Sequence, residues 1–215
     1  MEKIKVIEIF DSIEGEGSLI GYPTTFIRLE GCNLRCSWCD TKYSYDTDKY
    51  QLFSIEEILA KVNSFKNKKV CLTGGEPLYN QGFSELFQAL VFEGYFVIIE
   101  TNGTVYQPVI EKLWYRYKDK IFIVCSPKPF ASFAVENNLI PYIKELKFVV
   151  DTLLTKEDIL NVVSRFNFTP NLTFQPESNR KDMFEKARKL QKELLLERGL
   201  EFRVIPQVHK IFNLP

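Results

Sequence analysis

Apolar and polar residues recur along this 215-residue chain with two different periods. Short runs rich in β-branched and aromatic residues are typical of strands, and longer stretches with apolar residues three or four positions apart are typical of amphipathic helices. The first two runs, residues 3–10 and 24–30, predict strands that can pair as a hairpin. Helices are predicted at 55–66, 82–93, 108–118, 155–166 and 180–198, and strands alternate with them at 69–73, 95–101, 121–125, 145–150, 171–175 and 201–205.

This alternation predicts an α/β fold. Strands joined through helices at this spacing form right-handed crossover units and therefore a parallel sheet. Six parallel strands are fewer than the eight of a closed barrel, so the pattern fits an open, partial parallel β/α barrel or a doubly wound sheet. No repeat, low-complexity segment or linker divides the chain, and we expect a single domain over residues 1–215.

Composition and charge narrow the class of partner. The chain is 45% hydrophobic, enough for a substantial core, and its 28 Lys and Arg balance 28 Asp and Glu. This balance gives no electrostatic reason to expect a nucleic-acid or membrane partner, so a small neutral or anionic ligand is the better expectation. No segment approaches the roughly 20 apolar residues of a membrane span, and we expect a soluble, cytoplasmic protein.

Polar segments follow almost every predicted parallel strand. In both candidate architectures ligands bind at the carboxyl ends of the strands, so these segments predict one shared pocket. The segments are Thr-Gly-Gly-Glu-Pro at 73–77, Glu-Thr-Asn-Gly-Thr at 100–104, Cys-Ser-Pro-Lys at 125–128, Asp151, Gln-Pro-Glu-Ser at 175–178 and Pro-Gln-Val-His-Lys at 206–210.

Three of the five cysteines, Cys32, Cys36 and Cys39, fall within eight positions. An odd number of clustered cysteines indicates a reducing compartment and metal ligation rather than a disulfide framework. Three thiols are one short of the four ligands of a closed zinc site or an all-cysteine iron–sulfur cluster, so a metal here would keep one position open. Spacing alone also allows a zinc site completed by His209 or a distant cysteine. Cys71 and Cys125 lie in apolar strands and are expected to be small buried hydrophobes.

Two motifs together resemble the radical S-adenosylmethionine (SAM) superfamily. One is the Cys-x3-Cys-x2-Cys spacing with an aromatic residue, Trp38, before the last cysteine, and the other is Gly-Gly-Glu-Pro at 74–77. More narrowly, residues 12–17, Arg28, residues 39–41 and the tail at 207–210 resemble the 7-carboxy-7-deazaguanine synthase family. The resemblance covers nearly the whole chain and departs from the family at Glu14, where many members have Gln.

The resemblance implies the partial barrel of that superfamily, of about six strands with a reduced set of helices. It also implies a [4Fe–4S] cluster on the three clustered cysteines, SAM on the free iron, and an external flavodoxin-like or ferredoxin-like electron donor. Reductive cleavage of SAM would generate the radical that attacks the substrate. The resemblance assigns contacts with SAM or the cluster to Trp38, Asp40, Gly75, Glu76, Ser126, Pro127, Lys128, Gln175, Pro176, Glu177 and Ser178, with the Glu76 carboxylate on the ammonium of SAM. From the residues alone, the two glycines before Glu76 allow close backbone approach to a ligand.

The reaction implied by the resemblance is ring contraction of 6-carboxy-5,6,7,8-tetrahydropterin to 7-carboxy-7-deazaguanine with loss of ammonia, in queuosine and 7-deazapurine biosynthesis. Substrate contacts are assigned to Ile13, Glu14, Gly15, Glu16, Arg28, Thr73, His209 and Pro215, the last through its terminal carboxylate. Arg28 suits a carboxylate because its guanidinium can bind both oxygens, although an ion pair with Glu30 or an outward-facing position on the strand explains it equally well.

A magnesium ion that touches the substrate is assigned by the resemblance to Thr41. Asp40 beside it is the more obvious hard-oxygen ligand, and a turn cap accounts for either residue without a metal. We expect a homodimer, and no catalytic base is identifiable. Four aromatic residues near the cysteines are expected to cover the cluster, line a subunit contact or pack in the core: Phe10, Phe26, Tyr43 and Tyr45. Two other readings stay open, another radical SAM enzyme such as a glycyl-radical activase and a non-enzymatic zinc module.

Overall fold

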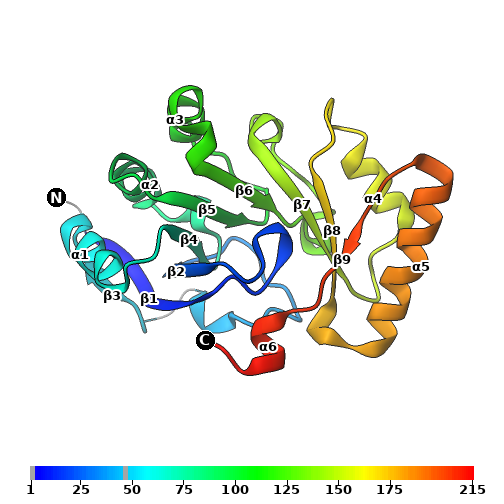
Figure 1. Ribbon diagram of the computed structural model, residues 1–215, viewed down its shortest axis with the longest axis horizontal. Helices are drawn as coiled ribbons and strands as arrows, with labels where there is room; N and C mark the ends of the chain where they lie inside the picture. Colours follow the sequence, from blue (N-terminus) through cyan, green and yellow to red (C-terminus); the bar gives the residue numbers. More distant parts are fainter. Residues whose placement is uncertain (1–2, 46–47) are drawn as a thin grey trace.

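The structure is a computed structural model that describes residues 3–45 and 48–215 (Figure 1). Its described strands form one nine-stranded sheet in the order β3-β1-β2-β4-β5-β6-β7-β8-β9. Strand β1 (Ile4–Ile13) pairs antiparallel with β2 (Pro23–Leu29), which confirms the predicted hairpin, and with the short β3 (Gln51–Phe53) on its other side. Three residues are too few for a periodic pattern, so β3 was not predicted.

The rest of the sheet is parallel. From β2 the ladder continues through β4 (Lys69–Gly74), β5 (Phe96–Thr101), β6 (Ile121–Cys125), β7 (Ile143–Val150), β8 (Asn171–Pro176) and β9 (Arg203–Val204). The six predicted parallel strands are confirmed. Strand β2 is a seventh, because it belongs to the opening hairpin and also pairs in parallel with β4.

Five predicted helices are confirmed with ends that differ by up to three residues, and a sixth was not predicted. They are α1 (Ile55–Phe65), α2 (Phe83–Phe92), α3 (Val109–Tyr117), α4 (Lys156–Val163), α5 (Lys181–Arg198) and the unpredicted α6 (Val208–Phe212). A capping box of Ser54 and Glu57 starts α1, with the Ser54 amide donating to Glu57 and the Glu57 amide donating to Ser54. None of the described helices is both long and apolar enough to cross a membrane.

The winding decides between the two predicted architectures. From β4 to β9 the strand order follows the sequence without reversal. Right-handed crossovers then place every helix on the same face, whereas a doubly wound sheet needs a reversal that sends helices to both faces. Figure 1 shows α1 to α5 around the outer side of the curved sheet and α6 on its inner side. Strands β3 and β9 lie at opposite ends and do not pair, so the barrel is open.

Alternate residues of each parallel strand point to opposite faces of the sheet. The outward residues are buried beneath the helices in one large core that includes Leu72, Ile99, Ile123, Phe148 and Phe174. Inward residues of the middle strands form a smaller apolar cluster that includes Cys71, Ile98 and Val124. The carboxyl ends of the inner face are polar, and this is where the pocket lies.

Candidate active site

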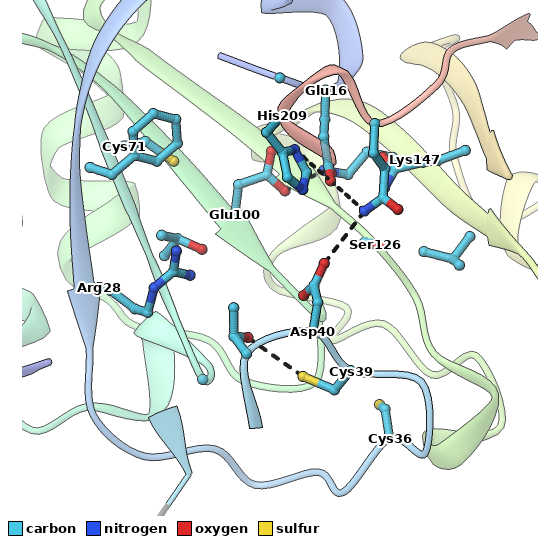
Figure 2. A pocket seen from close by; sticks show the side chains of 18 of the residues that line it. Glu16, Arg28, Cys36, Cys39, Asp40, Cys71, Glu100, Ser126, Lys147 and His209 are labelled. Atoms are coloured by element: carbon cyan, nitrogen blue, oxygen red, sulfur yellow. Dashed lines mark hydrogen bonds and ion pairs between the residues drawn. The ribbon is translucent and has the colours of Figure 1, made fainter. Parts of the chain in front are cut away.

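A cavity of about 490 Å³ lies on the inner face at the carboxyl ends of the strands (Figure 2). Small-molecule sites have volumes of this order. All but three of the predicted site residues line it, namely Ile13, Glu14, Gly15, Glu16, Arg28, Cys32, Cys36, Trp38, Cys39, Asp40, Thr41, Thr73, Gly75, Ser126, Lys128, Gln175, Glu177, Ser178, His209 and Pro215. The exceptions are Glu76, Pro127 and Pro176. Phe10, Phe26, Tyr43 and Tyr45 also line it, as does Cys71, which is buried as predicted.

The loop after β2 carries the three clustered cysteines to the cavity wall as free thiols. Within the described ranges no three His, Cys, Asp or Glu side chains are arranged to hold one metal ion. Burial raises the pKa of Cys36 to about 11 and also raises that of Cys32, so metal binding must displace their protons.

The two glycines at 74–75 allow the backbone of residues 29–31 to pass very close to the end of β4. A Cβ on Gly74 would lie 2.2 Å from the Leu29 carbonyl oxygen, and one on Gly75 would lie 2.1 Å from that of Gly31. The Glu76 amide donates to the same Gly31 oxygen at 2.8 Å. The two glycines therefore allow β2 and the start of the cysteine loop to pack closely against the end of β4, and Gly75 also lines the cavity, where contact with a ligand stays a prediction.

Glu76 is buried and its carboxylate is directed into the protein rather than to the cavity wall. It accepts hydrogen bonds from the Thr101 hydroxyl at 2.7 Å and from the amides of Leu78 and Asn102 at 3.1 and 2.6 Å. Burial raises its pKa to about 7 against the effect of these bonds. In this geometry Glu76 joins the end of β4 to the end of β5, and its contact with the ammonium of SAM stays a prediction.

A group of charged residues forms the wall opposite the cysteine loop. Lys147, on β7, donates hydrogen bonds to Glu16 at 2.6 Å and to Glu100 at 2.8 Å. Burial opposes ionisation of Glu16, but attraction to Lys147 and its hydrogen bond prevail and lower the pKa of Glu16 to about 2. Figure 2 shows these three residues near His209, with Arg28 on another side of the cavity.

Sequence reasoning gave no role to Lys147 or Glu100. Glu100 was noted only as part of a polar strand end. Lys147 interrupts the apolar run Leu146-Lys147-Phe148, and that interruption was the available signal, since a charge is rarely buried without a partner. Its partners lie 131 and 47 positions away along the chain, so the sequence alone does not identify them.

Arg28 is held by Glu8, its neighbour across the β1–β2 ladder. The Nε atom donates to Glu8 Oε1 at 2.6 Å, and the Tyr43 hydroxyl donates to the same oxygen at 2.9 Å. The alternative ion pair with Glu30 is wrong, because Glu30 lies 4.0 Å from Lys5 instead. No described residue hydrogen-bonds the two terminal nitrogens of Arg28, so they can bind both oxygens of a carboxylate.

The tail after β9 closes one side of the cavity. The Gln207 amide group donates to Glu16 at 2.9 Å and to Asp40 at 3.5 Å, and Lys210 lies 3.1 Å from the same Asp40 oxygen. His209 Nδ1 lies 3.8 Å from Glu16, and a Cβ on Gly15 would lie 2.7 Å from that nitrogen. The tail therefore joins the loop after β1 to the cysteine loop, and it uses the Asp40 carboxylate in doing so.

The remaining predicted cofactor residues surround the cysteine loop. The Trp38 ring nitrogen donates to Asp151 at 2.8 Å, and the Lys128 Nζ atom lies 5.2 Å from the Trp38 ring centroid. Lys128 also donates to the Ser126 hydroxyl at 2.7 Å. Gln175 is buried, and its Oε1 atom has no hydrogen-bond partner among the described residues. An unpaired buried acceptor is available to a ligand.

The Thr41 hydroxyl donates to the Gly74 carbonyl at 3.4 Å and lies 3.5 Å from Cys39 Sγ. It can offer an oxygen lone pair to the cavity.

Ser178 has a left-handed backbone with φ of 51°, in the turn that follows β8. Strained backbone of this kind gathers at ligand sites.

The fold and the cysteine geometry agree with comparisons to known proteins. The family model of the radical SAM superfamily matches residues 26–123. A 7-carboxy-7-deazaguanine synthase from Aquifex aeolicus is 46% identical over 214 residues, covering 98% of this chain and 94% of the relative. The chain belongs to the 7-carboxy-7-deazaguanine synthase family. Membership confirms the predicted resemblance and implies a [4Fe–4S] cluster, SAM and a reductant.

Further members and a solved structure support the 7-carboxy-7-deazaguanine synthase assignment. A synthase from Rickettsia prowazekii is 34% identical, covering 99% of this chain and 89% of the relative. The crystal structure of QueE from Escherichia coli superposes with a TM-score of 0.77 at 25% identity, covering 96% of this chain and 95% of that one. The likeness spans the whole sheet, so the partial barrel is the fold expected for this family.

Proposed function

We propose that this chain converts 6-carboxy-5,6,7,8-tetrahydropterin to 7-carboxy-7-deazaguanine with loss of ammonia, in queuosine and 7-deazapurine biosynthesis. The observation that carries the proposal is one cavity lined by three free thiols, an arginine with two available nitrogens and a wall of carboxylates. This set matches a carboxylated heterocycle with several N–H donors. A glycyl-radical activase acts on a protein substrate, and binding a protein does not require an arginine and several carboxylates inside one cavity.

The donor set of the cysteine loop fits a [4Fe–4S] cluster on Cys32, Cys36 and Cys39. When bound, the cluster and SAM supply the one-electron chemistry that removes a hydrogen atom from the substrate. Gln175 supports a SAM site, because its buried Oε1 atom lacks a partner. Other cavity-lining residues assigned to SAM or its surroundings are Trp38, Asp40, Gly75, Ser126, Lys128, Glu177 and Ser178. Pro127 and Pro176 shape the turns beside them.

Substrate binding is assigned to the residues around Arg28. The two terminal nitrogens of Arg28 bind the substrate carboxylate, and Thr73 lies beside Arg28 across the β2–β4 ladder. Glu14, Glu16 and the backbone of Ile13 and Gly15 read the polar edge of the pterin. The hydrogen bond from Lys147 holds Glu16 in place.

The tail excludes water and completes the site. His209 packs against Gly15, and Pro215 lines the cavity. Exclusion of water strengthens the polar contacts made inside the cavity. We include in the proposal an Mg²⁺ ion that takes one ligand from the Thr41 hydroxyl and the others from substrate and water. A homodimer, a single domain and a flavodoxin-like or ferredoxin-like donor complete the proposal.

An anaerobic assay tests this function. Protein reconstituted with iron and sulfide should be brown, hold about four irons per chain and cleave SAM only with a reductant. Incubation with the carboxy-tetrahydropterin should yield 7-carboxy-7-deazaguanine, and Arg28→Gln should raise KM by about 10- to 100-fold, as expected for loss of a charged contact. A colourless zinc protein would overturn the enzyme assignment. SAM cleavage without turnover of the pterin would overturn the substrate alone.

A further inference from the structure

Glu14, the residue after β1, has an incompletely paired carboxyl group at the cavity. Its side chain is only 4% exposed, and its Oε2 atom has no hydrogen-bond partner among the described residues. The backbone amide of Glu16 favours the ionised carboxyl group and lowers its pKa, but this does not satisfy Oε2. Burying an ionised carboxylate is strongly unfavourable when one of its oxygens has no hydrogen-bond partner. We therefore expect this carboxyl group either to be protonated or to bind a ligand.

The charged groups that face Glu14 come from several elements. They are Glu16 in the same loop, Glu100 on β5, Lys147 on β7 and the Cys71 thiol on β4. His209 on α6 packs against the neighbouring Gly15.

Lys147 already faces two carboxylates and makes no hydrogen bond to Glu14 among the described residues. Its two hydrogen bonds go to Glu16 and Glu100. An ionised Glu14 would add a third negative charge around one cation. Burial and then repulsion by Glu100 raise the pKa of Glu14 to about 8, which agrees with the missing hydrogen bond.

We propose that Glu14 acts as a neutral carboxylic acid that donates a hydrogen bond from Oε2 to an acceptor atom of the bound substrate. The proposal rests on the proposed function, because the acceptor belongs to the pterin. A neutral acid offers one donor and one acceptor, whereas a carboxylate only accepts. Glu14 therefore selects a heterocycle in which a ring nitrogen or carbonyl oxygen adjoins an N–H group.

The neighbouring Glu16 performs a different task. Its oxygens already accept hydrogen bonds from Lys147 and Gln207, and it stays ionised. The two glutamates therefore differ in protonation: Glu16 is ionised and can only accept hydrogen bonds from the ligand, whereas Glu14 is neutral and can also donate one. Substrate affinity should then fall as pH rises through the pKa of Glu14, because deprotonation removes the donor and adds a charge.

The test compares wild type with Glu14→Gln and Glu14→Leu, all loaded with cluster and SAM. Binding of the carboxy-tetrahydropterin is measured by anaerobic calorimetry from about pH 6.5 to 9. Wild-type affinity should fall about tenfold per pH unit above about 8, as expected for loss of one proton. Glu14→Leu should weaken binding about 10- to 100-fold at pH 7, the effect of losing a buried hydrogen-bond partner. Glu14→Gln should recover most of that loss and abolish the alkaline fall.

Infrared difference spectra between neutral and alkaline pH give a second readout that needs no turnover. Wild type should show a carbonyl band of a protonated carboxylic acid that Glu14→Gln lacks, in addition to any bands from Glu76 and Glu100, whose pKa values are also raised and which both proteins keep. A Glu14→Gln variant as weak as Glu14→Leu, together with no such band in wild type, would overturn the proposal. Failure of wild type to bind the pterin would instead overturn the proposed substrate, and the infrared band would still decide the protonation of Glu14.

Discussion

The two faces of the parallel sheet are built by neighbouring residues of the same strands, yet they differ in chemistry. On β4, β5 and β8 the outward residues Leu72, Ile99 and Phe174 are fully buried beneath helices. One residue further along each strand, Thr73, Glu100 and Gln175 line the cavity. A shift of one position therefore separates the residues that stabilise the fold from those that contact the ligand.

The outer face of the sheet contributes mainly to stability, and the inner face contributes mainly to ligand binding. Apolar burial on the outer face stabilises the protein by roughly 25 cal/mol for each Å² removed from water. The inner face instead buries charges and leaves polar atoms such as Gln175 Oε1 without partners, which lowers stability in exchange for binding. Substitutions on the outer face should therefore lower the free energy of unfolding, whereas substitutions on the inner face should weaken ligand binding.

The largest expected effect comes from the cysteine loop. Replacing Cys32, Cys36 and Cys39 together with Ala should abolish iron binding, colour and SAM cleavage, because no cluster ligand remains. Unfolding of the metal-free protein should change little, since the loop is outside the main core. Iron content and thermal unfolding measure the two outcomes.

Cys125 supplies the matched control on the outer face, where it is fully buried. Cys125→Ala should keep iron and cleavage but lower the free energy of unfolding by about 1 kcal/mol, as is typical for a small core truncation. Iron retained by the triple variant would place the cluster ligands elsewhere.

A second comparison uses adjacent residues of β8. Phe174 stacks on Phe202 with ring centroids 4.0 Å apart and meets the edge of Phe148 at 6.4 Å. Phe174→Ala should lower the free energy of unfolding by about 3 to 5 kcal/mol, through lost burial and the cavity left behind. Urea denaturation of the metal-free protein measures it.

Gln175→Ala should lower that free energy by less than about 1 kcal/mol, because the side chain has an unpaired oxygen in the absence of ligand. It should weaken SAM binding instead, which equilibrium dialysis measures. Equal destabilisation by the two variants would show that the faces do not divide stability from binding.

Local patterns predicted the elements on both faces but not how they meet. The helices and the strands from β4 to β8 follow from period and composition, and the cysteines with the polar strand ends indicated most of the cavity lining. The parallel pairing of β2 with β4 was not predicted, because β2 also carries a hairpin pattern. Helix α6 was missed because five residues carry little periodicity.

The register of strand pairing determines which side chains interact, and this register could not be predicted from the sequence. The sequence offered Glu30 as an ion-pair partner for Arg28, but pairing across the β1–β2 ladder places Glu8 beside it instead. The three internal hydrogen bonds that Glu76 accepts come from the 3-10 turn after β4 and the end of β5, segments that the sequence did not bring together, so they were not predicted. Lys147 was overlooked because its partners come from a loop and a strand distant in sequence.

The smallest expected effect concerns Glu8, which lies on the inner face beside Arg28 and leaves its side chain 40% exposed. Glu8→Gln keeps an acceptor for the Arg28 Nε atom but removes the charge, so the guanidinium should be held less firmly. We expect KM for the pterin to rise up to about fivefold with kcat nearly unchanged, because exposed ion pairs contribute up to about 1 kcal/mol. Tyr43→Phe removes the other bond to the same Glu8 oxygen and should shift KM in the same direction by less. A rise in KM that came with an equal loss of unfolding free energy would assign Glu8 to stability, and the inner face would then not be reserved for the ligand.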